Sequence, residues 1–264
     1  MGSTNPVFIL PGANRDRAEE IASGLKNSLT LGVGQFCTNP GLIITEKSSG
    51  ENIVIKKLGE KIKDSSPGIM LGPTIKRSYE AGIRKIDDNH DVKMVGASQV
   101  TRGETAVEAR VYTTDYETFV SHKYLSEEVF GPSTINISTR DKNEMIQMAK
   151  QLEGHLTATI LGNKEELMEY QNLIEVLQTK VGRLIFNGYP TGVEVCHSMV
   201  HGGPFPATTS SQSTSVGTAA IKRFARPFCF QDFPDNLLPP ALQNANPGTL
   251  IRLVNGSWTR KPVS

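Results

Sequence analysis

Residues 34–41 read Gly-Gln-Phe-Cys-Thr-Asn-Pro-Gly and join a segment of helical periodicity to a short apolar run. Cys37 therefore lies in a turn with a glycine at each end. Glycine adopts positive φ angles without steric cost, so backbone N–H groups in such a turn can approach a bound ligand. A cysteine there can attack a carbonyl carbon while backbone donors stabilise the oxyanion. A free cysteine can equally be a small buried hydrophobe, so the turn alone leaves a nucleophile and a packing residue open.

On both sides of this turn, apolar runs alternate with segments of helical periodicity. The expected strands cover residues 5–10, 42–44, 92–95, 106–112, 156–161 and 184–186, and the expected helices cover residues 15–29, 48–63, 75–86, 141–152 and 164–178. Strands that alternate with long helices require crossover connections. We therefore predict an α/β fold with a mostly parallel sheet flanked by helices. Ligands of such sheets bind beyond the carboxyl ends of the strands, so we expect the reactive groups at that edge.

Two polar patterns predict where helices begin. Residues 48–51, Ser-Ser-Gly-Glu, offer a serine that can cap the helix ending near Lys63. Residues 141–144, Asp-Lys-Asn-Glu, place an aspartate cap three positions before a glutamate. We therefore expect the helix after Asp141 to start at this aspartate.

The chain changes character after the last expected strand. Residues 188–217 are rich in Gly, Pro, Thr and Ser and show no clear period, which is typical of a functional wall or lid. The following segment contains Pro234, Pro239, Pro240 and Pro247, so we expect it to be extended. We predict a main domain over residues 1–226 and an extended C-terminal tail over residues 227–264.

Composition excludes several classes of function. The 264 residues carry 28 Lys+Arg against 27 Asp+Glu, so no broad electric field favours nucleic acid or an anionic membrane as a partner. No apolar run approaches the roughly 20 residues of a membrane helix, and no secretory signal pattern is visible. Cys37, Cys196 and Cys229 form no Cys-x-x-Cys pair. A cytoplasmic location is therefore expected.

Cys196, His197 and His201 raise the question of a metal site. The spacing of the two histidines can present both imidazoles on one face of a helix. Residues 202–204, Gly-Gly-Pro, argue against a long helix there, and no third ligand is suitably spaced. We therefore predict no metal. The sequence also lacks the Gly-x-Ser-x-Gly pattern of serine hydrolases and a glycine-rich phosphate loop.

Three stretches, in a specific order, resemble the aldehyde dehydrogenase superfamily. Residues 34–41 resemble its nucleophilic cysteine segment. Residues 127–132, Glu-Glu-Val-Phe-Gly-Pro, resemble the segment that contacts the nicotinamide riboside, and residues 2–7, Gly-Ser-Thr-Asn-Pro-Val, the stretch after the general-base glutamate. The branch containing α-ketoglutaric semialdehyde dehydrogenases is similar in two finer details, namely Cys-Thr-Asn-Pro-Gly within the first stretch and residues 186–195, Phe-Asn-Gly-Tyr-Pro-Thr-Gly-Val-Glu-Val. The resemblance covers essentially the whole chain.

The resemblance implies a chemistry for the first two motifs. Cys37 attacks the aldehyde carbon as a thiolate and forms a thiohemiacetal, the hydride passes to the nicotinamide ring, and water hydrolyses the remaining thioester. The backbone N–H of Cys37 is the implied oxyanion donor. Glu128 is implied to accept hydrogen bonds from the nicotinamide ribose, with Phe130 packed beside the ring. The alternative from the residues alone is a solvated acidic corner at Glu127 and Glu128 and a core position for Phe130.

The resemblance also implies substrate contacts. Phe36, Asn187 and Phe205 would line the aldehyde pocket, and the substrate would be a small-molecule aldehyde, with α-ketoglutaric semialdehyde as the leading one. The local alternative is that Phe205 only packs its own loop.

Relative to the family, the sequence begins just after the general-base glutamate and lacks the upstream nucleotide-binding half. The resemblance therefore implies the catalytic half of an NAD(P)-dependent enzyme, with the cofactor, NAD or NADP, bound mainly by the missing N-terminal half. We expect the chain alone to be inactive and the intact enzyme to be a homo-oligomer. Two alternatives stay open: a non-catalytic remnant or interaction module of the same fold, and a cysteine-dependent esterase that uses Cys37 without a nucleotide.

Overall fold

The computed structural model describes residues 2–47, 52–66, 68–99, 103–190 and 192–263. The chain divides into two units, which span residues 1–223 and 224–264 and are described separately. Within the described ranges, every helix is too short or too polar to cross a lipid bilayer.

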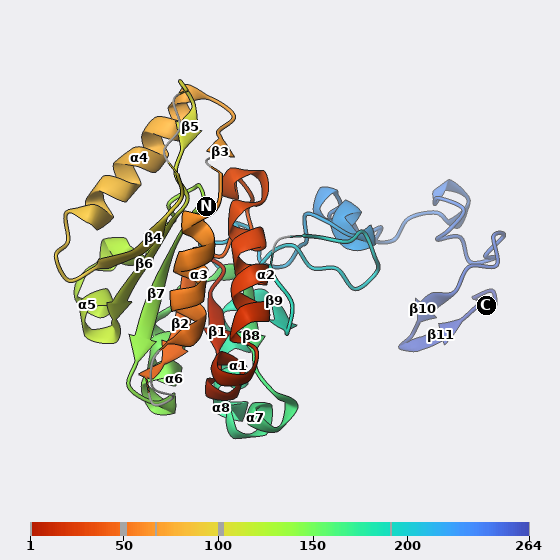
Figure 1. Cartoon of the computed structure of the whole chain (residues 1–264). Coiled ribbons are helices and arrows are strands. Elements are labelled where there is room, and N and C mark those ends of the chain that lie inside the picture. Colours follow the sequence, from red (N-terminus) through yellow and green to blue (C-terminus); the bar gives the residue numbers. More distant parts are fainter. Residues whose placement is uncertain (1, 48–51, 67, 100–102, 191, 264) are drawn as a thin grey trace. The chain divides into compact units, whose positions relative to one another are not determined.

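A seven-stranded sheet forms the centre of the first unit (Figure 1). In spatial order its strands are β4 (Lys93–Ala97), β6 (Arg110–Asp115), β7 (Ser133–Thr139), β2 (Leu42–Glu46), β1 (Val7–Ile9), β8 (His155–Leu161) and β9 (Val181–Phe186). β4 pairs antiparallel with β6, whereas the other neighbouring strands are parallel. The predicted α/β fold with a mostly parallel sheet is confirmed.

The central strands are apolar on both faces. Val7, Phe8 and Ile9 of β1 are at most 1% exposed. Val7 and Ile9 join one hydrophobic cluster, and Phe8 joins the other. Successive side chains of a strand point to opposite faces, so one short apolar run supports two layers of helices.

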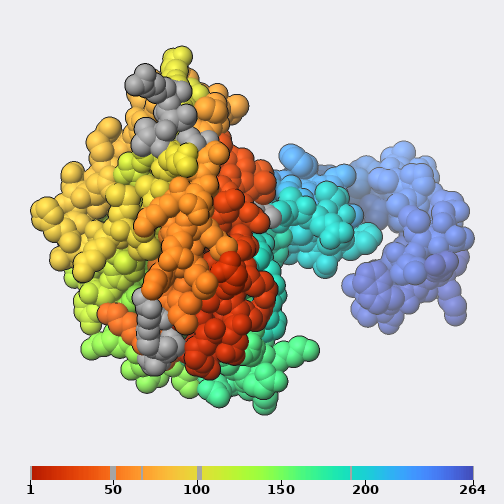
Figure 2. Space-filling model, in the orientation of Figure 1, coloured from red at the N-terminus to blue at the C-terminus, as the bar shows by residue number. Residues whose placement is uncertain are grey.

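One face of the sheet is covered by α1 (Pro11–Asp16), α2 (Ala18–Thr30) and α3 (Ile53–Lys63). α2 and α3 lie side by side on this face (Figure 2, red and orange). Each helix has a row of buried side chains spaced four apart, at Ile21, Leu25 and Leu29 in α2 and at Val54, Leu58 and Ile62 in α3. This spacing aligns the side chains in one stripe, which packs on the sheet.

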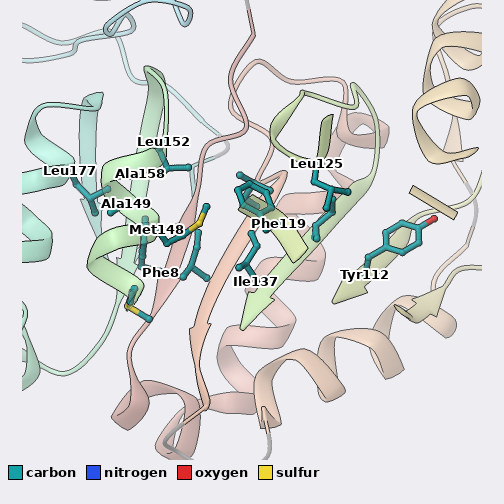
Figure 3. Close-up of a cluster of buried hydrophobic side chains, with 14 of the residues drawn as sticks. Phe8, Tyr112, Phe119, Leu125, Ile137, Met148, Ala149, Leu152, Ala158 and Leu177 are labelled. Carbon is teal, nitrogen blue, oxygen red and sulfur yellow. The ribbon is translucent and has the colours of Figure 1, made fainter. Parts of the chain in front are cut away.

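The other face is covered by α4 (Pro73–Asp87), α5 (Tyr116–Ser121), α6 (Lys142–Gln151), α7 (Lys164–Glu169) and α8 (Gln171–Gln178). Figure 3 shows the cluster that they enclose, with Phe8 of β1 facing Met148 of α6 and Ile137 of β7 nearby. A small antiparallel pair, β3 (Gly68–Ile69) with β5 (Ala106–Val107), forms a separate two-stranded sheet. Short 3-10 turns among the described residues include η1 (Leu31–Gly34), η3 (Lys123–Ser126), η4 (Thr218–Phe224) and η5 (Asp235–Leu237).

Several predicted elements are divided in the structure. The helix expected over residues 15–29 is two helices that break at Arg17, and the one over residues 164–178 breaks at Tyr170. The strand expected over residues 106–112 is β5 and β6. α5 and β7 were not predicted. β7 reads Ser-Thr-Ile-Asn-Ile-Ser-Thr and is therefore mostly polar. Its buried Asn136 forms hydrogen bonds with side chains of the neighbouring strands. A search for apolar runs does not detect such a strand.

The predicted cap of α6 is confirmed, because the Oδ1 of Asp141 accepts a hydrogen bond of 2.9 Å from the backbone N–H of Glu144. The Glu144 carboxylate accepts from the N–H of Arg140 at 2.6 Å. For α3 the cap is Asn52, whose Oδ1 accepts from the N–H of Ile55 at 3.3 Å. The serines predicted to cap this helix lie outside the described residues.

The second unit consists mainly of irregular chain. It also contains a hairpin of β10 (Arg252–Val254) and β11 (Ser257–Thr259), which was not predicted. Asn255 and Gly256 join the strands with φ angles of 48° and 81°. An Asn-Gly turn with two positive φ angles is the favoured two-residue hairpin connection, so the sequence did contain a signal for it.

Candidate active site

The three motifs meet at one edge of the sheet. Ser3 precedes β1, Cys37 precedes β2 and Glu128 precedes β7, and these strands run parallel. The site therefore lies at the amino ends of the strands, and the expectation of a site at the carboxyl ends was wrong. The carboxyl end of β1 leads directly into α1 at Pro11. Here the three motifs lie in segments that enter the strands.

Gly34 brings the cysteine turn against the second motif. Its φ angle is +65°, and a Cβ at this position would lie 2.3 Å from the carbonyl carbon of Gly131. No L side chain fits such a contact, so glycine is required by both the backbone and the space. Asn39 strengthens the contact, because its Nδ2 donates a hydrogen bond of 3.0 Å to the carbonyl oxygen of Gly131.

A buried carboxamide holds Cys37 in place. Asn5 is 0% exposed, and its Nδ2 donates to the carbonyl oxygens of Cys37 at 3.0 Å and Asn39 at 2.9 Å. It also lies 3.1 Å from the carbonyl oxygen of Ser3. Its Oδ1 accepts from the hydroxyls of Ser3 at 2.8 Å and Thr157 at 3.1 Å. A fully satisfied polar group of this kind fixes the backbone of the turn relative to β1 and β8.

The thiol of Cys37 is exposed to a cavity of about 440 Å³. Glu128 and Phe130 of the second motif line the same cavity, together with Gly2, His201 and Arg223. The fold therefore brings together the predicted nucleophile and the two predicted cofactor contacts, although they are far apart in the sequence.

The surroundings of Cys37 act in both directions on its acidity. Burial is the largest effect and raises the pKa of the thiol, and the negative charge of Glu128 raises it further. The backbone N–H groups of Cys37 and Thr38 and the charge of Arg183 oppose this rise. Since the net shift is upward, the neutral thiol is the resting form near neutral pH, and the thiolate fraction grows as the pH rises.

Glu128 and its neighbour Glu127 occupy different environments. The Oε2 of Glu128 accepts a hydrogen bond of 3.2 Å from the N–H of Ser3, and burial raises the pKa of this carboxyl. The carboxylate of Glu127 instead lies 3.9 Å from the Nζ of Lys85. The two neighbouring glutamates therefore have different partners. Phe130 is 38% exposed and borders the cavity beside Glu128.

His201 is a site residue that the sequence did not single out for this role. Its Nε2 lies 3.1 Å from the Sγ of Cys37, and the two residues are 164 positions apart. Burial lowers the pKa of its imidazole, and the charge of Arg183 adds to this effect. It was considered only as a metal ligand, and no cluster of three or more His, Cys, Asp or Glu suited to a metal occurs in the part of the chain that the structure describes.

The three predicted substrate contacts are absent from the described lining of this cavity. Phe36 is 41% exposed and lies against Gly32. Phe205 is 77% exposed, although Ala207 of the same loop does border the cavity. Asn187 follows β9, and so lies at the opposite edge of the sheet from Cys37.

Asn187 has a structural partner at that opposite edge. Its Nδ2 donates a hydrogen bond of 2.9 Å to the carbonyl oxygen of Gly162, and its Oδ1 accepts from the N–H of Gly162 at 3.1 Å. The side chain thereby joins the segments that follow β8 and β9.

Comparison with known proteins gives a consistent result. A family model described as the aldehyde dehydrogenase family matches residues 1–226. The chain is 42% identical over 260 residues to α-ketoglutaric semialdehyde dehydrogenase 2 of Azospirillum brasilense, covering 97% of this chain and 49% of the relative. It is 40% identical over 261 residues to α-ketoglutaric semialdehyde dehydrogenase of Acinetobacter baylyi, covering 98% and 50%. The chain spans about half the length of the curated relatives it matches.

Solved structures share the fold at lower identity. A salicylaldehyde dehydrogenase from Pseudomonas putida, complexed with salicylaldehyde, is 18% identical with a TM-score of 0.65, covering 88% of this chain and 48% of that one. Lactaldehyde dehydrogenase from Escherichia coli is 16% identical with a TM-score of 0.67, covering 85% and 46%. A glyceraldehyde-3-phosphate dehydrogenase from Methanocaldococcus jannaschii, complexed with NADP, is 19% identical with a TM-score of 0.61, covering 77% and 43%.

Removing the buried carboxamide tests its role in holding the turn. Asn5→Ala removes the side-chain donor of the Cys37 carbonyl oxygen and the acceptor of the Ser3 and Thr157 hydroxyls, and each buried group left unpaired costs about 1–3 kcal/mol. We expect the free energy of unfolding in urea to fall by about 2–4 kcal/mol. Asn172→Ala, at an exposed position of α8, is the control and should change it by less than about 0.5 kcal/mol. Equal effects of the two substitutions would contradict this role.

His155 predicts a pH dependence of stability. It is 6% exposed, its Nδ1 accepts from the N–H of Thr4 at 3.2 Å, and burial lowers its pKa to about 4. In the unfolded chain the pKa of His155 is near 6.5, so the unfolded chain takes up a proton at higher pH than the folded state does. The folded state is therefore favoured above about pH 6.5 and loses this stability as the pH falls towards about 4, by up to about 3 kcal/mol.

The measurement is urea unfolding at a series of pH values. His155→Asn retains an acceptor for the N–H of Thr4 and cannot titrate, so its stability should fall less steeply below about pH 6.5. His90→Asn, at an exposed position, should keep the wild-type slope. A wild-type slope in His155→Asn would show that His155 does not cause the pH dependence.

Proposed function

Because the chain belongs to the aldehyde dehydrogenase family, we propose that it carries the catalytic half of an NAD(P)-dependent enzyme that oxidises an aldehyde to a carboxylic acid. The observation that supports this most strongly is the exposure of Cys37 to a cavity that Glu128 and Phe130 also line. The catalytic domain would comprise residues 1–226, and residues 227–264 would form the tail.

α-Ketoglutaric semialdehyde is the substrate that we propose. The two curated relatives at 42% and 40% identity carry this name. This aldehyde has a carboxylate at its far end, which needs a cationic partner. Arg223 borders the cavity, and Arg183 acts electrostatically on both Cys37 and His201. Two cationic side chains near the thiol are consistent with an anionic substrate.

In the proposed reaction, Cys37 adds to the aldehyde carbon and holds the substrate covalently. Sulfur suits this step because a thiolate is a strong nucleophile and a good leaving group from the later thioester. The N–H groups of Cys37 and Thr38 favour negative charge beside the sulfur. The same donors can stabilise the oxyanion that develops when the sulfur–carbon bond forms.

The residues present fit a nicotinamide cofactor. Glu128 accepts one hydrogen bond through Oε2, from Ser3, and among the described residues no donor reaches Oε1. A carboxylate with a spare acceptor at the wall of the cavity suits the hydroxyls of a ribose. Glu128 would hold the nicotinamide ribose, and Phe130 would pack beside the ring. When bound, NAD or NADP supplies the acceptor for the hydride that leaves the substrate.

We also propose that the intact enzyme is a cytoplasmic oligomer, and two features support this. The three cysteines are free thiols, which suits a reducing compartment. Within the second unit, Phe228, Leu253 and Trp258 are 66%, 57% and 73% exposed. Large apolar side chains in such positions are typical of surfaces that meet another subunit.

Aldehyde protection of Cys37 tests the proposal on the chain itself. The chain is incubated with α-ketoglutaric semialdehyde and pulsed with iodoacetamide, and alkylation of each cysteine is followed by peptide mass spectrometry. A thiohemiacetal removes the free thiol, so alkylation of Cys37 should slow at least about tenfold at saturating aldehyde. Alkylation of exposed Cys229 should be unchanged.

α-Ketoglutarate, which has a carboxylate in place of the aldehyde, is the control ligand and should protect far less. Equal labelling of Cys37 and Cys229 with no protection would favour a non-catalytic remnant. An acyl group that accumulates on Cys37 from an activated ester, with no protection by the aldehyde, would favour the cysteine-dependent esterase.

A further inference from the structure

The short contact between Cys37 and His201 joins the thiol to a residue from the irregular stretch after β9. The Sγ and Nε2 atoms are 3.1 Å apart, which is within hydrogen-bond range for sulfur. Both residues line the cavity of the proposed active site. The imidazole is therefore in direct contact with the atom that forms the covalent bond.

The backbone on either side of the imidazole is fixed by hydrogen bonds. The N–H of His201 donates to the Oγ1 of Thr214 at 2.8 Å. Its carbonyl oxygen accepts from the N–H of Ser215 at 3.0 Å and from the hydroxyl of Ser215 at 2.9 Å. These bonds hold the segment that carries the ring and limit the positions that Nε2 can take relative to the sulfur.

The charges around the pair favour its neutral form. Glu128 faces the thiol from the segment before β7, Arg183 faces both groups from β9, and Arg223 borders the cavity from η4. Burial and Glu128 raise the pKa of the thiol, whereas burial and Arg183 lower the pKa of the imidazole. When the ring proton of the neutral imidazole resides on Nδ1, Nε2 is free to accept the S–H proton of Cys37 across this contact.

The environment of the His201 Nδ1 atom is a second, independent observation. The atom is buried, and among the described residues it has no hydrogen-bond partner. An unsatisfied buried polar atom is unfavourable, so packing alone does not account for a polar ring at this position. The polar ring is explained if its other nitrogen has a chemical task at the sulfur.

We propose that His201 is a catalytic residue, the base that accepts the thiol proton of Cys37 when the sulfur attacks the aldehyde; this inference rests on the proposed function. The S–H bond breaks and its proton passes to Nε2 while the S–C bond forms. The π electron pair of the carbonyl moves onto the aldehyde oxygen, which then takes the proton from the imidazolium. The products are a neutral thiohemiacetal and a neutral His201, so atoms and charge balance without an oxidant.

The test measures the rate at which iodoacetamide alkylates Cys37 in the full chain, over a range of pH, with Cys229 as the internal reference. General bases contribute about 100-fold or more to such transfers, so His201→Gln should slow the alkylation of Cys37 at least about tenfold at neutral pH. Below the pKa of the thiol, the variant's rate should fall about tenfold per pH unit, whereas the wild-type rate falls less steeply.

A matched control lies on the same irregular stretch. His197 has its Nδ1 2.9 Å from the hydroxyl of Thr218, and no described contact joins it to Cys37. His197→Gln should keep the wild-type rate and pH profile at Cys37. A wild-type rate in His201→Gln, or an equal loss in both variants, would overturn the proposal.

Chemical rescue separates a catalytic role from a structural one. In His201→Ala the imidazole is removed, and free imidazole added to the solution should restore the alkylation rate of Cys37 in proportion to its concentration. Loss of rate without rescue would show that His201 only maintains the structure, and would overturn the proposal.

Failure of this inference is distinguishable from failure of the proposed function. A base changes the rate of thiohemiacetal formation and not its equilibrium, so α-ketoglutaric semialdehyde should still protect Cys37 in His201→Gln after full equilibration. Protection with no effect of His201 on alkylation would sink only the role of His201. A clear effect of His201 with no protection in the wild type would sink the proposed function instead.

Discussion

The site depends on the buried carboxamide of Asn5, which connects the cysteine turn to the centre of the sheet. Its Nδ2 donates to the carbonyl oxygens of Cys37 and Asn39, and its Oδ1 accepts hydroxyls from Ser3 and Thr157. A turn can hold a thiol in a fixed place only if its backbone polar groups are satisfied in one arrangement. One side chain meets that requirement for two carbonyl groups of the turn at once.

The same contacts determine where the candidate site lies. The turn enters β2, and the segments before β1 and β7 enter the same edge of the parallel sheet. Asn5 joins the segment before β1 to the turn, and the hydrogen bond from Asn39 to Gly131 joins the turn to the segment before β7. Burial at this edge keeps the thiol of Cys37 and the imidazole of His201 neutral. A neutral thiol needs a base close by when it attacks, and the contact at 3.1 Å supplies one.

Sequence reasoning succeeded where a residue's environment is local or its motif is specific. β1 and β2 were predictable because strands buried on both faces are continuous apolar runs. β7 was not, since its buried Asn136 is satisfied only by side chains of other strands. Cys37 and Glu128 were proposed from family motifs, and the structure places both at one cavity. His201 was missed because it lies in a stretch without periodicity and its contact, Cys37, is 164 positions away in the sequence. Asn187 lies at the opposite edge of the sheet because of the order and direction of the strands, which no local sequence pattern reveals.

A crystal structure of the chain soaked with α-ketoglutaric semialdehyde tests the central claim most directly. The account predicts continuous electron density from the Sγ of Cys37 to a tetrahedral carbon, inside the cavity that Glu128 and His201 line. An aldehyde held in that cavity with no bond to the sulfur, or an adduct only at Cys196 or Cys229, would contradict it.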